Sequence, residues 1–386
     1  MSVIKFFEST DAGAPTLNNA VGSMIAVLDA CLITGYNTKS ITSITVASGV
    51  ATVVCTAHAY ANTYGKDIRI AGATGSFTAL NKDTNIANVT TNGFTFLCPG
   101  VIDGVATGTL TAKYAPLNWT KQYAGTNKAM YKRSNVASTG CMLRIDDASV
   151  SISSRALMVK TASDVDTYTD PSPTSVQIAG GLGQHWIKAY GAANAAAVDW
   201  FVVADDLLLY LFVKSNAGNS YLAHIFGDKP SFRPADVLNC VIGGLTTNND
   251  GNPLSGANTG AALVILGGKN GITTSQPIAV RDRNDSYGVS GGSAVYPSAV
   301  DGGLVINYPV LTAEPSATSD IRGMLPGLAT PVANLSNGSS NTFPLKTQIS
   351  NIIGSARTFL VCPVASSVSS GTTVNVALLD LTGPWR

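Results

Sequence analysis

The chain has 386 residues, of which 12% are charged and 45% are hydrophobic, and its formal net charge is +1 at pH 7. Soluble domains typically carry about 25% charged residues, so Ser, Thr, Asn and Gly must supply much of the polar surface. Bases and acids nearly cancel, which disfavours binding of nucleic acid or of an anionic membrane through clustered Lys and Arg. Glutamate occurs only at Glu8 and Glu314, so a favoured helix former is missing and the chain is not expected to be mainly helical.

The first 40 residues predict one amphipathic helix. Thr16 is placed to cap it, and Gly35 sits where a C-terminal glycine would end it. Apolar residues recur at helical spacing at Leu17, Val21, Met24, Ile25, Leu28 and Leu32. This single stripe indicates that residues 1–40 pack on the main domain. Glu8 and Asp11 interrupt the region where a secretory leader would be apolar, so no such leader is expected.

Residues 41–113 change to short alternating runs separated by Gly, Asn and Asp. The runs are Ile44–Val46, Thr52–Val54, Ile68–Ile70 and Phe94–Phe96. Alternation with frequent turn residues is typical of antiparallel β-structure. We therefore expect a small inserted antiparallel β-domain over residues 41–113.

Residues 114–386 predict a larger, β-sandwich-like main domain. Its strand candidates are Met142–Ile145, Leu157–Lys160, Trp200–Ala204, Leu207–Val213, Val237–Ile242, Leu263–Leu266, Leu304–Val310, Thr358–Val361 and Val374–Leu379. Many are apolar at every position, which favours strands covered on both faces. Asp205 and Asp206 separate two of these runs and predict a tight hairpin. Long Gly, Ser and Asn tracts at 246–260, 284–303 and 331–342 are expected to be functional or ordered by a partner.

Motifs that could carry catalysis do not have the context they need. The stretch Gly288–Gly292 matches the G-x-S-x-G nucleophile motif, but its flanks lack the required strand and helix. The acid pairs Asp146–Asp147 and Asp205–Asp206 could suggest a glycosidase, but turns between strands explain them better. A secreted hydrolase is the enzymatic alternative, and the missing leader argues against it.

Metal and cofactor motifs are similarly weak. Asn248–Asn252 lacks the spaced acids of a calcium loop, and Gly180–Gly183 lacks dinucleotide-binding spacing. The histidines His58, His185 and His224 are interpreted as structural. No C-x-x-C pair of metal-site spacing occurs. The even number of cysteines would permit disulfides in a secreted protein, but without an export signal buried free thiols are expected at Cys31, Cys55, Cys98, Cys141, Cys240 and Cys362. The sequence therefore predicts no catalytic residue, no cofactor-binding residue and no metal ligand.

Two interpretations remain open for Arg281–Asp285, the densest charged stretch. It is either a solvated loop or an ion-pair site at an interface, where the planar guanidinium of Arg is favoured. Nothing in the sequence decides between them.

Several segments resemble virion structural proteins of tailed bacteriophages. They are Ala115–Trp119, Gly125–Tyr131, Trp200–Asp205, Phe226–Asp228, Ile321–Leu328 and the ending Leu379–Arg386. The resemblance covers roughly residues 1–40 and 114–386. Residues 41–113, with Ala57–Tyr60 and Ile70–Ala73, resemble a small β-module that recurs in phage tail and capsid-surface proteins. No catalytic residues come with this resemblance.

The resemblance implies a non-enzymatic, multimeric subunit in the tail, baseplate or fibre region of a virion assembled in the host cytoplasm. Its expected partners are copies of itself and other virion proteins, with no nucleic acid and no membrane insertion. One alternative is a capsid decoration or head-fibre protein. Another is a module that recognises host-surface glycan through aromatic side chains such as Tyr287, Tyr296 and Tyr308, although tyrosines in strands more often serve packing.

Overall fold

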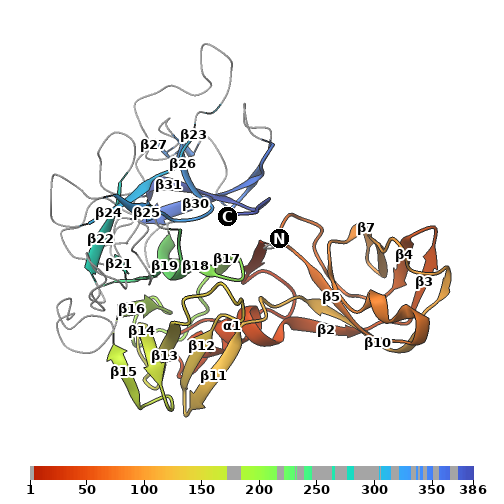
Figure 1. Cartoon of the computed structure of the whole chain (residues 1–386), viewed down its shortest axis with the longest axis horizontal. Helices are drawn as coiled ribbons and strands as arrows, with labels where there is room; N and C mark the ends of the chain where they lie inside the picture. The colour runs from red at the N-terminus through yellow and green to blue at the C-terminus, as the bar shows by residue number, and fades with distance from the viewer. Residues whose placement is uncertain are drawn as a thin grey trace.

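The computed structural model describes residues 4–171, 184–214, 221–230, 232, 239–245, 263–265, 276–281, 304, 306–313, 321–331, 336–337, 340–341, 346–350, 356–365 and 373–386. Over these residues the chain is mainly β, as the sequence predicts (Figure 1). Helical structure within these residues is limited to α1 (Ser23–Asp29), a π-helical turn at Ala30–Thr34 and a 3-10 turn at Gly75–Leu80.

Among the described residues, the largest sheet has fourteen strands and contains most of the strands in the second half of the chain. Its path runs β23-β26-β31-β30-β19-β20-β21-β22-β24-β25, with β18, β17 and β1 continuing from β19 and β29 pairing with β30. Its strands are β1 (Lys5–Glu8), β17 (Trp200–Ala204), β18 (Leu208–Lys214), β19 (Tyr221–Asp228), β20 (Cys240–Gly243), β21 (Leu263–Ile265), β22 (Gln276–Arg281), β23 (Ile306–Asn307), β24 (Val310–Ala313), β25 (Ile321–Met324), β26 (Leu328–Pro331), β29 (Gln348–Ile349), β30 (Phe359–Ala365) and β31 (Thr373–Asp380).

A six-stranded sheet packs beside this one. Its strands are β11 (Thr120–Gly125), β12 (Lys128–Lys132), β13 (Met142–Asp146), β14 (Ser153–Ala162), β15 (Tyr168–Pro171) and β16 (Gln184–Ile187). A separate two-stranded ribbon joins β27 (Ser336–Asn337) to β28 (Ser340–Asn341). In Figure 1, β17, β18 and β19 lie between the six-stranded sheet and the pair β30–β31.

The strands β17, β18 and β19 are buried on both faces, and the continuous apolar runs of β17 and β18 predict this for those two strands. Alternate side chains enter two different cores. Val202 belongs to the core shared with α1 and the six-stranded sheet, whereas Phe201 and Val203 belong to the core shared with β30 and β31. The β17–β18 hairpin is confirmed, and the Asp205 carboxylate organises its turn by accepting the Leu207 and Leu208 amides at 2.8 and 2.6 Å.

The prediction that Thr16 caps the first helix is wrong, because α1 begins at Ser23. Leu17 instead pairs with Val198 in an isolated β-bridge. The cap comes from the distant Asp147, whose carboxylate accepts the Met24 amide at 2.9 Å. The helical segment ends before Gly35, as predicted. Gly35 has a positive φ of 70°, and a Cβ atom at this position would lie 2.2 Å from a backbone oxygen, so glycine is required there.

Two further sheets form a small β-sandwich from residues 36–114. One sheet contains β2 (Tyr36–Ser40), β10 (Thr107–Tyr114), β5 (Ile68–Thr74) and β6 (Asp83–Thr84). The other contains β7 (Ala87–Thr90), β8 (Gly93–Leu97), β4 (Val50–Val54), β3 (Ser43–Ala47) and β9 (Gly104–Val105). Their inward side chains, including Phe94, Phe96, Ile70 and Leu110, are buried. In Figure 1 this sandwich projects from the rest of the molecule.

Buried ion pairs join the projecting sandwich to the first strand of the large sheet. The Lys66 ammonium lies 2.6 Å from Asp11 and 3.2 Å from Glu8, and it stands 4.2 Å from the centre of the Phe6 ring. Lys5 pairs with Asp83 at 2.5 Å, and burial is the main cause that lowers the pKa of Lys5. Because these charges are largely removed from solvent, separating the two parts would leave them unpaired.

Candidate functional site

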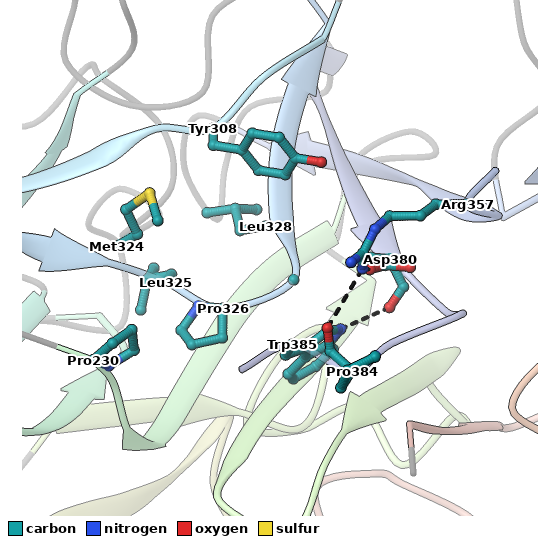
Figure 2. A pocket seen from close by; sticks show the side chains of 11 residues that line it. Pro230, Tyr308, Met324, Leu325, Pro326, Leu328, Arg357, Asp380, Pro384 and Trp385 are labelled. Atoms are coloured by element: carbon teal, nitrogen blue, oxygen red, sulfur yellow. Dashed lines mark hydrogen bonds and ion pairs between the residues drawn. The ribbon is translucent and has the colours of Figure 1, made fainter. Parts of the chain in front are cut away.

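A pocket of 210 Å³ lies where the β25–β26 turn meets the end of the chain (Figure 2). Aromatic, apolar and charged groups line it, including Tyr308, Met324, Pro326, Arg357, Asp380 and Trp385. These residues come from four separate segments of the second half of the chain. Figure 2 shows the two aromatic rings at opposite ends, with the charged pair beside them.

Trp385 is a fixed wall of the pocket. Its indole Nε1 donates a hydrogen bond to the Asp380 carbonyl at 2.9 Å, and its ring meets Tyr210 edge-on with centroids 5.6 Å apart. Gly327 lies directly against the indole, where a Cβ would approach ring atoms to 2.2 Å. Tyr308 forms a more open wall, since 46% of the residue is exposed.

The polar part of the pocket is an ion pair between Arg357 and Asp380. The same guanidinium donates to the Pro384 carbonyl at 3.5 Å. The other carboxylate oxygen of Asp380 accepts the amides of Thr382 and Gly383 at 2.8 and 3.3 Å. The positive charge is therefore matched by a negative one, and backbone contacts hold the carboxylate in place.

The last residue anchors this wall to the large sheet. Arg386 pairs with the buried Asp205 and donates to the Asp228 carbonyl at 2.6 Å. Burial raises the pKa of Asp205, and the Arg386 charge opposes that shift. Arg386 thus balances the negative charge of the buried Asp205 carboxylate, which the β17–β18 turn requires.

The chemistry of the pocket suits binding. Its described lining residues include no histidine, cysteine or serine, and the carboxylate of Asp380 is held by Arg357 and by the amides of Thr382 and Gly383. Two aromatic rings and one neutralised ion pair provide apolar contact together with a few oriented polar groups. That combination is common in ligand pockets.

A second candidate surface is the outer face of the β7-β8-β4-β3-β9 sheet. Its outward positions form register rows, in which Ala47 lies opposite Val50 and Val50 lies opposite Leu97. The next row pairs Thr45 with Thr52, and Thr52 with Thr95. Leu97 is 71% exposed and Val105, on β9, is 60% exposed. The outward residues of β3, β4 and β8 are all uncharged.

The structure places the three histidines outside the pocket. His58 is buried, and its Nδ1 accepts the Tyr60 amide at 3.0 Å. His185 Nδ1 contacts the Ser153 hydroxyl at 2.7 Å. His224 accepts the Ile187 amide at 3.0 Å and stacks on Trp186, and burial lowers its pKa to about 3. Each ring contacts a neighbouring part of the chain, although the buried His224 Nδ1 has no hydrogen-bond partner among the described residues.

Asp147 is more than a turn residue. It forms an ion pair with Lys188 in which both side chains are fully buried, and the Ser154 hydroxyl donates to it at 2.8 Å. The Lys188 ammonium also donates to the carbonyls of Ala20 and Ser149 at 2.8 and 3.2 Å. This cluster joins the start of α1 to the six-stranded sheet.

Several sequence motifs lie outside the described residues. They are Gly180–Gly183, Asn248–Asn252, Gly288–Gly292, all of the charged stretch after Arg281, and the two tyrosines Tyr287 and Tyr296. Of the three tyrosines that suggest glycan binding, the structure describes Tyr308 and places it in the pocket.

All six cysteines are buried free thiols. Across the part of the chain that the structure describes, no three His, Cys, Asp or Glu residues are arranged to hold a metal ion. Within the same residues, no helix has the length and apolarity needed to cross a membrane.

Sequence reasoning missed Trp385, Arg357 and Asp380 as site residues. The ending Leu379–Arg386 did carry a signal, because it places Trp next to Arg in a chain with few of either. The sequence does not show which residues this ending contacts, because Arg357 and the β25–β26 turn lie next to it only in the folded chain.

No protein-family model matches this chain, and no curated protein sequence matches it.

Proposed function

We propose that the chain is a non-enzymatic structural subunit of a tailed-phage virion, placed in the external tail, baseplate or fibre region. The observation that carries this proposal is the uncharged outer face of the projecting sandwich. The low charge of the whole chain and the resemblance of its segments to phage virion proteins add support.

The outer face suits burial against a neighbouring subunit. Exposed sheets ordinarily carry charged side chains, which discourage association with other sheets. Here Thr, Val and Leu occupy most of the outward positions, and Val50, Val54, Leu97 and Val105 are each more than one-third exposed. Covering the outward side chains of β3, β4 and β8 desolvates apolar carbon and small hydroxyl groups, and none of these side chains is an ion.

The position of the face also suits assembly. The sandwich extends away from the body of the molecule (Figure 1), and the ion pairs of Lys5 and Lys66 fix its base. A stable contact usually covers about 800 Å² on each partner, more than one face of a few short strands provides. Assembly would therefore use this face together with other surfaces of neighbouring copies.

The test combines particle composition with a surface variant. Mass spectrometry of purified particles should detect the chain, and the double variant Val50→Lys/Leu97→Lys should enter particles less efficiently than the wild type. Val136→Lys is the matched control, because Val136 is fully exposed and lies outside the sandwich. Both variants should unfold at the wild-type temperature.

Two results would contradict the proposal. Detection of the chain in infected-cell lysate but never in particles would remove the virion role. Normal incorporation of the double variant would remove the outer face as the contact surface. Copy number separates the capsid alternative: an abundance near that of the major capsid protein would favour decoration of the head, and an abundance matching a single ring would favour the tail.

A further inference from the structure

We propose that the pocket formed by Tyr308, Arg357, Asp380 and Trp385 binds one neutral sugar ring, a hexopyranose unit of a glycan. This inference concerns the purified chain and does not depend on its place in a particle. A subunit that binds the sugar but never enters a virion would keep this proposal and lose the previous one.

The walls of the pocket fit the two kinds of surface on a sugar ring. The C–H faces of a pyranose are apolar and stack on aromatic rings, and aromatic side chains supply a large contact area at small entropic cost. Tyr308 and Trp385 offer such rings at opposite ends of the pocket (Figure 2). Met324 and Pro326 add apolar lining between the strands.

The charge pattern selects a neutral ligand. Arg357 would attract phosphate or carboxylate if it stood alone, because its fork-shaped guanidinium matches both groups. Its ion pair with Asp380 already places a carboxylate against that fork. The Asp380 side chain is only 3% exposed and its oxygens accept from Arg357, Thr382 and Gly383, whereas the Arg357 side chain is 38% exposed and can donate hydrogen bonds to sugar hydroxyls.

The size and rigidity of the pocket favour a small ligand. Drug-sized molecules occupy pockets of about 300–1,000 Å³, and this one has a volume of 210 Å³. Gly327 allows the indole to lie flat against the turn, and Asp380 fixes its nitrogen. Because these contacts exist before any ligand arrives, little ordering would be needed on binding.

The binding experiment uses the full chain and four methyl glycosides, those of glucose, galactose, mannose and rhamnose. Saturation-transfer NMR should show contact with at least one glycoside, and titration of tryptophan fluorescence should give its affinity. Methyl glucuronide and a proline-rich peptide serve as competing ligands, since an anionic sugar and an extended peptide are the other classes that aromatic pockets accept.

Two variants locate the site. Tyr308→Ala removes an exposed ring and should weaken binding about three- to tenfold without changing the unfolding temperature. Arg357→Lys keeps the charge opposite Asp380 but loses the planar fork, and it should also weaken binding. Tyr64→Ala is the matched control, because Tyr64 is 53% exposed and does not line the pocket.

Each remaining outcome overturns the inference. Absence of transfer to all four glycosides would show that the pocket does not take a neutral hexose. Stronger binding of the glucuronide or of the peptide would assign another ligand class. Glycoside binding that Tyr308→Ala leaves unchanged would place the sugar elsewhere on the molecule.

Discussion

Replacing Asp147 by asparagine should destabilise the chain severely. The carboxylate accepts the Met24 amide, the Ser154 hydroxyl and the Lys188 ammonium, and the two ionised side chains are fully buried. Asparagine can accept through only one oxygen, and its amide nitrogen would face other donors, which leaves Lys188 as a buried charge without a counterion. Breaking a buried ion pair by removing one partner costs about 3–5 kcal/mol, more than the ~1 kcal/mol of a helix cap alone.

Urea denaturation followed by tryptophan fluorescence would measure this loss. The double variant Asp147→Asn/Lys188→Met should recover much of it, because the uncompensated ammonium is then absent. Lys128→Gln is the matched control, since Lys128 pairs with the exposed Asp166, which keeps Arg144 as a second partner, and the unfolding midpoint of this variant should stay close to that of the wild type. An Asp147→Asn variant as stable as the wild type, or a double variant no better than the single one, would refute the reasoning.

Three further changes test other buried contacts. Burial lowers the pKa of His224 to about 3. In the unfolded chain this histidine takes up a proton below its usual pKa of about 6.5, whereas in the folded chain it stays neutral, so the free energy of unfolding falls as the pH drops below 6.5. Urea denaturation should show that the wild type loses about 2 kcal/mol between pH 7.5 and pH 5 and that His224→Gln does not. Gly327→Ala should lower the thermal midpoint more than Gly100→Ala, because both glycines have positive φ but only Gly327 faces an indole ring; equal shifts in calorimetry would exclude the clash. Arg386→Met should lower the free energy of unfolding by about 3 kcal/mol at neutral pH, because it leaves the Asp205 carboxylate without its partner. This loss of stability should shrink in acid, because burial already raises the pKa of Asp205 and the carboxyl group then becomes neutral. A loss of stability that does not depend on pH would contradict this.

Local pattern was sufficient for the β class and for the most buried strands. Continuous apolar runs predicted that β17 and β18 are covered on both faces, and the structure divides their side chains between two cores. The turn at Asp205 was also predictable, because a short polar break between two such runs leaves room only for a hairpin. These features depend on neighbouring residues, which the sequence displays directly.

The start of the first helix was not predictable in the same way. Thr16 is a good capping residue, but the Met24 amide at the start of α1 is instead accepted by the Asp147 carboxylate, 123 residues further along the chain. That carboxylate is held by Lys188 and by burial, so it offers the helix a stronger acceptor than a local hydroxyl. Propensity describes only the local choice, and packing decided between the two.

What the residues alone determined is a protein poor in charge, built from alternating and continuous β-runs, with an aromatic and basic ending. Only the tertiary structure brought Trp385 against Gly327, placed Arg357 beside Asp380 and turned an uncharged sheet face outward. The physical reason is the range over which the interactions act along the chain. Backbone preference and side-chain period act over a few residues, whereas the pocket and the outer face arise from strand pairing and ion pairs between segments far apart in the chain.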